Sequence, residues 1–214
     1  MPKVLAVVPM GTGVADEIAA MFDKAVEWAP DVNYDAILFE GGSDIHPSLY
    51  NDPNTDSSVG DQPSHRDLVE VDAMKDAIRK GALIIGVCRG AQLACAMAGG
   101  KLVQHVDNHG RTHEVVTKDK QIFNVSSVHH QMMYPWDIEH DMLAWSKQRQ
   151  SPRYLGHKLN MTKHVVEPEA VFFPTINALA FQWHPEWYAS TGEIEFTINQ
   201  IKEKMDERTP VSCC

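Results

Sequence analysis

Short apolar runs typical of β-strands alternate with amphipathic stretches along the first half of the chain. The runs at residues 3–10, 34–42 and 82–87 predict strands, and the last of them is apolar at nearly every position. Helices are predicted over residues 14–28 and 67–80, where apolar side chains recur at helical spacing. Near-continuous apolar strands are typical of parallel sheets covered by helices, so this alternation predicts βαβ units and an α/β fold.

The second half of the chain predicts shorter elements. Short strands and turns are expected over residues 101–135, a hairpin over 169–184 and a closing amphipathic helix over 191–207. No linker-like stretch separates these segments, so one domain is predicted over residues 1–207. Residues 208–214 are expected to form a flexible tail.

The composition narrows the class of protein. With 43% hydrophobic residues among 214, the chain can bury a core without a metal or disulfide framework. The formal net charge of −10 argues against nucleic acid or an anionic membrane surface as the partner, because both attract basic proteins. No apolar run approaches the ~20 residues that a membrane span needs.

The four cysteines do not follow the pattern of a secreted disulfide scaffold. Cys88 and Cys95 lie in one apolar segment, whereas Cys213 and Cys214 end the chain. This usage favours a reducing cytosol, and we expect a cytoplasmic protein.

A single cysteine between two glycines separates a predicted strand from a helix-like run. Residues 86–90 read Gly-Val-Cys-Arg-Gly, the same pattern as the G-x-S-x-G nucleophile elbow. The glycines permit a tight turn that presents Cys88 at a helix N-terminus, which favours a thiolate. The backbone N–H of Arg89 can then donate to a developing oxyanion. Taken alone, the pattern fits a small buried core cysteine equally well.

A histidine and a glutamate two residues apart follow the last predicted strand. Pro185 pushes His184 toward an extended conformation, and residues two apart on an extended segment face the same side. Glu186 can therefore reach one imidazole nitrogen while the other faces a thiol, which with Cys88 completes the parts of a cysteine triad. A third stretch, Gly41-Gly42, ends another predicted strand, where the lack of a Cβ lets a backbone N–H approach a bound group.

Together these stretches resemble the class I glutamine amidotransferase superfamily, and most closely its gamma-glutamyl-gamma-aminobutyrate hydrolase type of gamma-glutamyl peptidase. The matching motifs are GG-x-D at 41–44, RD-x-x-E at 66–70, VCRGAQ at 87–92, SSVHHQ at 126–131 and QWHPE at 182–186. The resemblance implies a single flavodoxin-like three-layer domain with a mostly parallel central sheet and a nucleophile elbow.

The resemblance also implies roles for individual residues. Cys88 would be the nucleophile, His184 the acid and base, and Glu186 the partner that orients the imidazole. The backbone N–H groups of Arg89 and Gly42 would form the oxyanion hole. The residues expected around the bound glutamyl group are Gly41, Gln92, Ser127, His129 and His130. No metal and no organic cofactor are expected.

The sequence departs from the family pattern at two places. Only one predicted helix separates the first strand from residues 34–42, where family members usually have an additional strand. Ser126 stands where the family usually has asparagine, which affects the expected recognition of the glutamyl group.

The leading functional hypothesis is hydrolysis of a gamma-glutamyl amide bond through a gamma-glutamyl thioester, with a small-molecule gamma-glutamyl substrate. The first alternative is a glutaminase subunit that supplies ammonia to a separate synthetase, which would then be its partner. The second is a non-enzymatic or redox relative that uses only the elbow cysteine. The sequence does not decide which amine leaves, or between a monomer and a homodimer.

A histidine-rich segment stands apart from these motifs. His105, His109 and His113 are spaced by four, which on a helix would align them as metal ligands. Because Asp107, Asn108 and Gly110 disfavour a helix, we predict an exposed loop, partly facing the substrate, and no metal site.

Overall fold

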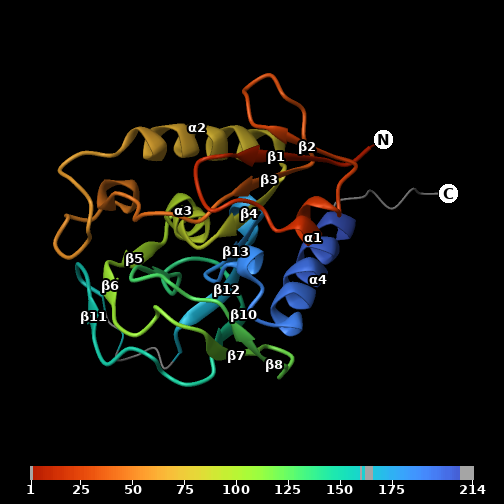
Figure 1. The fold of residues 1–214 in the computed structure, drawn as a ribbon. Coiled ribbons are helices and arrows are strands. Elements are labelled where there is room, and N and C mark those ends of the chain that lie inside the picture. Colours follow the sequence, from red (N-terminus) through yellow and green to blue (C-terminus); the bar gives the residue numbers. More distant parts are fainter. Residues whose placement is uncertain (1, 160, 162–165, 208–214) are drawn as a thin grey trace.

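A nine-stranded sheet crosses the computed structural model of the protein from one edge to the other (Figure 1). The structure describes residues 2–159, 161 and 166–207, and the predicted tail at 208–214 lies outside them. The strand order is β2-β1-β3-β4-β13-β12-β10-β7-β8.

One half of the sheet is parallel and carries the nucleophile elbow. Its strands are β2 (Lys24–Glu27), β1 (Val4–Val8), β3 (Ala36–Phe39), β4 (Leu83–Val87) and β13 (Ala178–Phe181). Since these are five of the nine strands, the predicted α/β fold with a mostly parallel central sheet is confirmed. Cys88 follows directly after β4, at the carboxyl ends of these strands, where sites of open α/β sheets usually lie.

The other half of the sheet is antiparallel. It continues through β12 (Pro168–Phe173), β10 (Asp141–Ser146), β7 (His113–Thr117) and β8 (Ile122–Val125). β12 and β13 form the predicted hairpin. Two small pairs lie beside this sheet, β6 (His105–Val106) with β11 (Tyr154–Leu155) and β5 (Lys101–Val103) with β9 (Met132–Tyr134).

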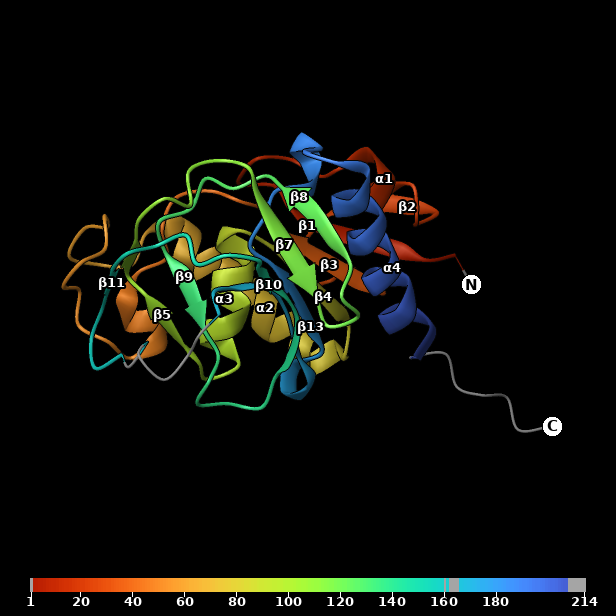
Figure 2. The same ribbon diagram turned by 90° about the horizontal axis from the view of Figure 1, so that it is seen from below.

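Helices cover both faces of the sheet, which gives three layers (Figure 2). α2 (His65–Lys80) and α3 (Arg89–Met97) pack on one face, and α1 (Asp16–Ala19) and α4 (Thr191–Glu207) on the other. The pleat of the strands sorts their side chains between these layers, since neighbouring residues point to opposite faces. Ile37 and Phe39 pack toward α2 and α3, whereas Ala36 and Leu38 pack toward α4. None of the helices in the described ranges is long and apolar enough to cross a membrane.

The prediction of one helix over residues 14–28 is wrong. Helix α1 covers only Asp16–Ala19, and Lys24–Glu27 form the edge strand β2. β2 pairs in parallel with β1, so the additional strand of the family pattern is present after all. Helix propensity of Lys, Ala and Glu is worth only tenths of a kcal/mol per residue, and backbone pairing with β1 outweighs it.

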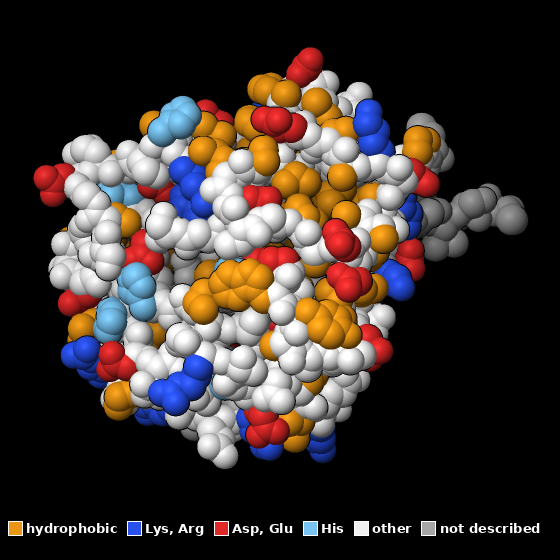
Figure 3. Space-filling view, in the orientation of Figure 1, with side chains coloured by type: hydrophobic (Ala, Val, Ile, Leu, Met, Phe, Trp, Pro, Cys, Tyr) orange, Lys and Arg blue, Asp and Glu red, His pale blue; other side chains and the backbone are white. Residues whose placement is uncertain are grey.

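On the face shown in Figure 3, acidic and basic side chains are interspersed and histidines gather at one side. Hydrophobic side chains lie between them near the centre of this view. The mixture of signs on this face shows that the net negative charge is not concentrated into one patch there.

Candidate active site

Cys88 occupies a tight turn between β4 and α3. Its φ of 48° and ψ of −99° lie where non-glycine residues rarely occur, as is common at functional sites. The turn depends on the two flanking glycines. A Cβ on Gly86 would lie 2.5 Å from the carbonyl carbon of Gly90, and one on Gly90 would lie 2.3 Å from the carbonyl oxygen of Phe39. The chain therefore forms the elbow that the G-x-C-x-G pattern predicts.

The electrostatic surroundings of the thiol differ from the expectation. The backbone N–H groups of Arg89 and Gly42 both face Cys88 Sγ and lower its pKa, but burial has the larger effect and raises the pKa to about 12. The N–H of Arg89 at the helix N-terminus thus favours the thiolate as expected, but burial outweighs this effect and keeps the thiol neutral in the protein without substrate. The two N–H groups expected in the oxyanion hole nevertheless both lower the pKa of this thiol.

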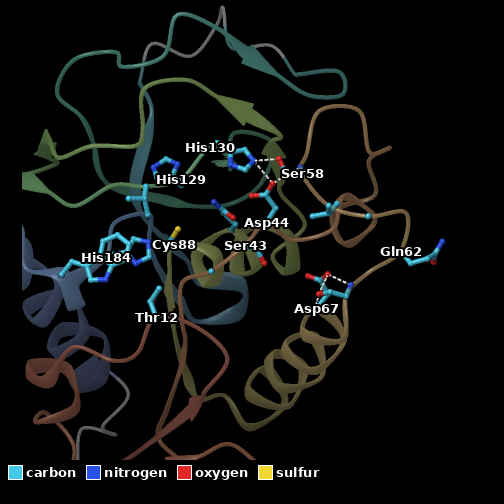
Figure 4. Close-up of a pocket in the computed structure, with 17 residues that line it drawn as sticks. Thr12, Ser43, Asp44, Ser58, Gln62, Asp67, Cys88, His129, His130 and His184 are labelled. Atoms are coloured by element: carbon cyan, nitrogen blue, oxygen red, sulfur yellow. Dashed lines mark hydrogen bonds and ion pairs between the residues drawn. The ribbon is translucent and has the colours of Figure 1, made fainter.

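Pairing between neighbouring strands brings His184 to the cysteine. Phe181 on β13 pairs with Val87 on β4, and the backbone N–H of Cys88 donates to the carbonyl oxygen of Phe181 at 2.7 Å. The residues that follow these two strand ends, His184 and Cys88, consequently line one pocket (Figure 4).

The imidazole of His184 is fixed on several sides. Its Nδ1 lies 2.7 Å from Oε1 of Glu186, and the indole of Trp187 stacks on the ring at a centroid distance of 3.9 Å. Its Nε2 is buried and has no hydrogen-bond partner. If Nδ1 carries the proton shared with Glu186, Nε2 is left with a lone pair for a proton from a neighbouring group.

Ser126 supports His184 from the main-chain side. The backbone N–H of His184 donates to Ser126 Oγ at 3.0 Å, and this hydroxyl also lies 2.7 Å from Oε1 of the buried Glu193. Ser126 does not line the pocket. The residue that replaces the usual asparagine therefore affects the placement of the histidine rather than a direct contact with substrate.

The pocket has a volume of about 500 Å³. The site residues predicted from the sequence that line this pocket are Gly42, Cys88, Gln92, His129, His130 and His184. Gly41 and Ser127 do not line it. Gly41 instead packs against the imidazole of His184, and Ser127 donates to the backbone oxygen of His109 at 2.7 Å.

Asp44 and His130 form an ion pair on the pocket wall away from the triad (Figure 4). Asp44 Oδ2 lies 2.7 Å from His130 Nε2, and the hydrogen bond that this carboxylate accepts from His130 raises the pKa of His130 above its ordinary value. No role was predicted for Asp44 from the sequence, although it belongs to the GG-x-D motif. Ser58 and Gln62 are further lining residues that no motif indicates.

A buried ion-pair network lies beneath the pocket. Arg89 is 1% exposed, pairs with Asp67 at 2.7 Å and Glu70 at 3.0 Å, and donates to the backbone oxygens of Ser43 and Asp44. Its guanidinium thus ties α2 and α3 to the loop that provides the N–H of Gly42. Asp67 and Glu70 belong to the RD-x-x-E motif and Arg89 to the CRG motif, so these ion pairs join the two motifs next to the pocket.

The prediction that the histidine-rich segment forms an exposed loop is wrong for two of its three histidines. His109 and His113 are 1% and 7% exposed and lie among buried carboxylates, whereas His105 is partly exposed beside Asp107. The antiparallel half of the sheet covers this segment, and nothing in its local spacing indicates that packing.

Comparisons with known proteins agree with this arrangement. The family described as Peptidase C26 matches residues 23–186. The glutamine amidotransferase-like protein YvdE of Lactococcus lactis subsp. lactis is 27% identical over an alignment of 191 residues, with 78% of this chain and 72% of that protein covered. A glutamine amidotransferase-like protein of Rickettsia prowazekii is 34% identical over 88 residues, 41% of this chain and 31% of that protein.

Solved structures share the fold. A GMP synthase subunit from Thermoplasma acidophilum superposes with a TM-score of 0.61 at 14% identity, covering 97% of this chain and 96% of that one. A glutamine amidotransferase from Thermotoga maritima gives a TM-score of 0.56 at 13% identity, with 96% and 84% covered. The Peptidase C26 match spans most of the chain and includes Cys88, His184 and Glu186. This chain therefore belongs to the Peptidase C26 family, within the class I glutamine amidotransferase-like superfamily.

Proposed function

We propose that this protein hydrolyses gamma-glutamyl amide bonds through a covalent thioester on Cys88, in the manner of gamma-glutamyl-gamma-aminobutyrate hydrolases. The observation that carries the proposal is that Cys88, at a strained turn, shares one pocket with His184, whose Nδ1 lies 2.7 Å from Oε1 of Glu186. A core cysteine needs none of these partners.

The first half of the reaction forms the thioester. As Cys88 Sγ attacks the side-chain carbonyl carbon of the substrate, its proton moves to Nε2 of His184, because the buried thiol is neutral beforehand. Glu186 holds Nδ1 and stabilises the imidazolium that forms. The N–H groups of Arg89 and Gly42 donate to the oxyanion. His184 then protonates the leaving amine as the carbon–nitrogen bond breaks.

The second half consumes water. His184 takes a proton from a water molecule that attacks the thioester carbonyl. As the carbon–sulfur bond of the tetrahedral intermediate breaks, His184 returns this proton to Cys88 Sγ, which releases glutamate and restores the thiol. The same base and the same two N–H donors serve both halves, so every step uses groups of this chain and water.

The glutaminase alternative is supported by the names and folds of relatives, which include a glutamine amidotransferase-like protein and a GMP synthase subunit. In that case ammonia would be the leaving group and a separate synthetase the partner. The redox alternative is disfavoured by the His184–Glu186 pair in the pocket of Cys88, because a sensor cysteine needs no such pair.

The test is glutamate release by the purified protein alone, offered glutamine beside a panel of gamma-glutamyl amines and peptides. We expect turnover of gamma-glutamyl amides in preference to glutamine, and none with Cys88→Ala. Weak turnover confined to glutamine would favour the glutaminase alternative. Wild-type rates with Cys88→Ala would overturn both.

A further inference from the structure

Three histidines and two glutamates meet behind one wall of the pocket. His109 and His113 come from the segment that enters β7, His129 from the loop between β8 and β9, and Glu167 and Glu169 from the start of β12. All five side chains are buried. None belongs to the triad or to its oxyanion hole.

Three of these residues have the spacing of metal ligands. One ligand atom from each of His109, His129 and Glu169 lies within 4.8 Å of the other two. In a tetrahedral zinc site the ligand atoms are about 3.3 Å apart, so closing around an ion needs movements of roughly 1.5 Å or less. Small rotations of the side chains supply such movements.

His129 presents a free lone pair to this centre. Its Nδ1 lies 2.8 Å from the backbone carbonyl oxygen of Gln131. A carbonyl only accepts hydrogen bonds, so Nδ1 carries the hydrogen and Nε2 of the neutral ring holds a lone pair. This Nε2 is buried and has no hydrogen-bond partner among the residues that the structure describes, which is uncommon for a nitrogen in a protein interior.

Glu169 also has one oxygen available. Its Oε1 accepts hydrogen bonds from His113 Nε2 at 2.8 Å and from Ser146 Oγ at 3.0 Å. Its Oε2 is buried and has no hydrogen-bond partner within the described ranges of the chain. The carboxylate is thus oriented by His113 and Ser146 through one oxygen, which leaves the other free to bind an ion.

His109 lies between the two carboxylates. Its Nδ1 is 3.5 Å from Oε1 of Glu169 and its Nε2 is 3.4 Å from Oε2 of Glu167, and neither nitrogen forms a hydrogen bond. With Nδ1 on an ion, the Nε2–H would face Glu167. That is the carboxylate–histidine–metal arrangement common around zinc.

We propose that His109, His129 and Glu169 bind one divalent transition-metal ion of the zinc type. Two imidazole nitrogens and one carboxylate oxygen favour zinc or a similar ion over Mg²⁺ and Ca²⁺, which prefer oxygen ligands.

The position of the site indicates what the ion does. His129 lines the substrate pocket, and its neighbours in the cluster lie on a different loop and on β12. An ion here clamps these three segments together and fixes the pocket wall at His129. The role is structural, and no step of the proposed hydrolysis passes through the ion.

The test titrates chelator-treated protein with Co²⁺ and Zn²⁺ in a Cys88→Ser background, which removes the pocket thiol. We expect one ion per chain and the visible d–d bands of four-coordinate Co²⁺, without absorption from thiolate ligands. Zn²⁺ should displace Co²⁺, and Mg²⁺ should not. X-ray absorption of the Zn²⁺-loaded wild-type protein should show nitrogen and oxygen ligands and no sulfur.

Variants locate the site. Glu169→Gln should abolish stoichiometric binding, and His113→Gln should weaken it roughly 10- to 100-fold because it removes a partner that orients Glu169. His105→Gln is the matched control, since His105 belongs to the same histidine-rich segment but pairs with Asp107. It should bind like wild type.

Measuring Tm with added ions tests the proposal even if the Glu169→Gln variant does not fold. Zn²⁺, but not Mg²⁺, should raise the Tm of the wild-type protein and of His105→Gln. Wild-type protein that binds no ion, a sulfur ligand in the absorption spectrum, or equal loss in His105→Gln would overturn the proposal. None of these measurements depends on hydrolysis.

Discussion

Nδ1 of His184 lies 2.7 Å from Oε1 of Glu186, and both side chains are almost completely shielded from water. The pair fixes which imidazole nitrogen carries the proton. With Nδ1–H held by the carboxylate, Nε2 is the basic nitrogen, and it has no competing partner. Under the proposed mechanism, the tautomer of His184 therefore depends on Glu186.

Glu186→Gln should lower kcat roughly 10³- to 10⁴-fold, because an amide can donate to Nδ1 and stabilise the wrong tautomer. KM should change little, since Glu186 does not line the pocket. The check is steady-state kinetics with the best gamma-glutamyl amide. Glu195→Gln removes the same charge from the exposed face of α4 and serves as the control. A kcat within a few-fold of wild type for Glu186→Gln would contradict the triad.

The Cys88 thiol should react slowly with iodoacetamide at neutral pH in the absence of substrate. Burial raises its pKa to about 12, so the thiolate fraction is small there. The modification rate should rise about tenfold per pH unit and reach no plateau below pH ~10, because only the thiolate reacts. Rates are followed on the peptide that contains Cys88, since Cys95 is a second buried cysteine.

A modification rate that reaches a plateau near neutral pH would contradict a neutral Cys88 thiol in the protein without substrate. A free thiol of ordinary pKa ~8.5, measured in parallel, marks where a plateau is expected for an unperturbed group. A Cys88 rate that is already flat near pH 7 would indicate a thiolate–imidazolium pair instead.

Gly41→Ala should displace the imidazole of His184. A Cβ at Gly41 would lie 2.4 Å from Cε1 of His184, well inside contact distance, so the ring must shift by about 1 Å. We expect kcat to fall on the order of 100-fold while the protein stays folded, because a 1 Å misplacement costs about that much. Kinetics and a thermal melt together separate the two effects.

Gly110→Ala is the matched control for this substitution, because a Cβ there meets nothing within 4 Å. Its kcat should equal that of the wild-type protein. A Gly41→Ala enzyme as active as Gly110→Ala would show that His184 has room to move without loss, and that its position is less important than the contact suggests.

The elbow and the His-Pro-Glu stretch could be predicted from sequence because their geometry is local. Gly86 and Gly90 meet within one turn, and two residues around Pro185 place His184 and Glu186 on one side. The parallel sheet then follows from the alternation of apolar runs. These features need no knowledge of distant contacts.

The features that sequence reasoning missed depend on pairing between distant segments. Residues 24–27 have helix-forming side chains, and only the free edge of β1 makes them a strand. His109 lies buried beside Glu169, which follows 60 residues later in the sequence, and such a contact leaves no local pattern. The GG-x-D, RD-x-x-E and CRG motifs can each be recognised in the sequence. Only the folded structure shows that Arg89 contacts residues of the other two motifs.

Arg89→Met should destabilise the protein by about 3–5 kcal/mol, because it leaves the buried carboxylates of Asp67 and Glu70 without this partner. For a chain of this size the loss lowers Tm by roughly 10 °C or more. Thermal and urea unfolding measure it, and Lys147→Met, which breaks the exposed pair with Glu114, should leave stability almost unchanged. The loop 41–44 also loses its hydrogen bonds to Arg89, so residual folded enzyme should turn over more slowly. Equal stability of the two variants would show that Arg66, which also pairs with Glu70, holds the network without Arg89.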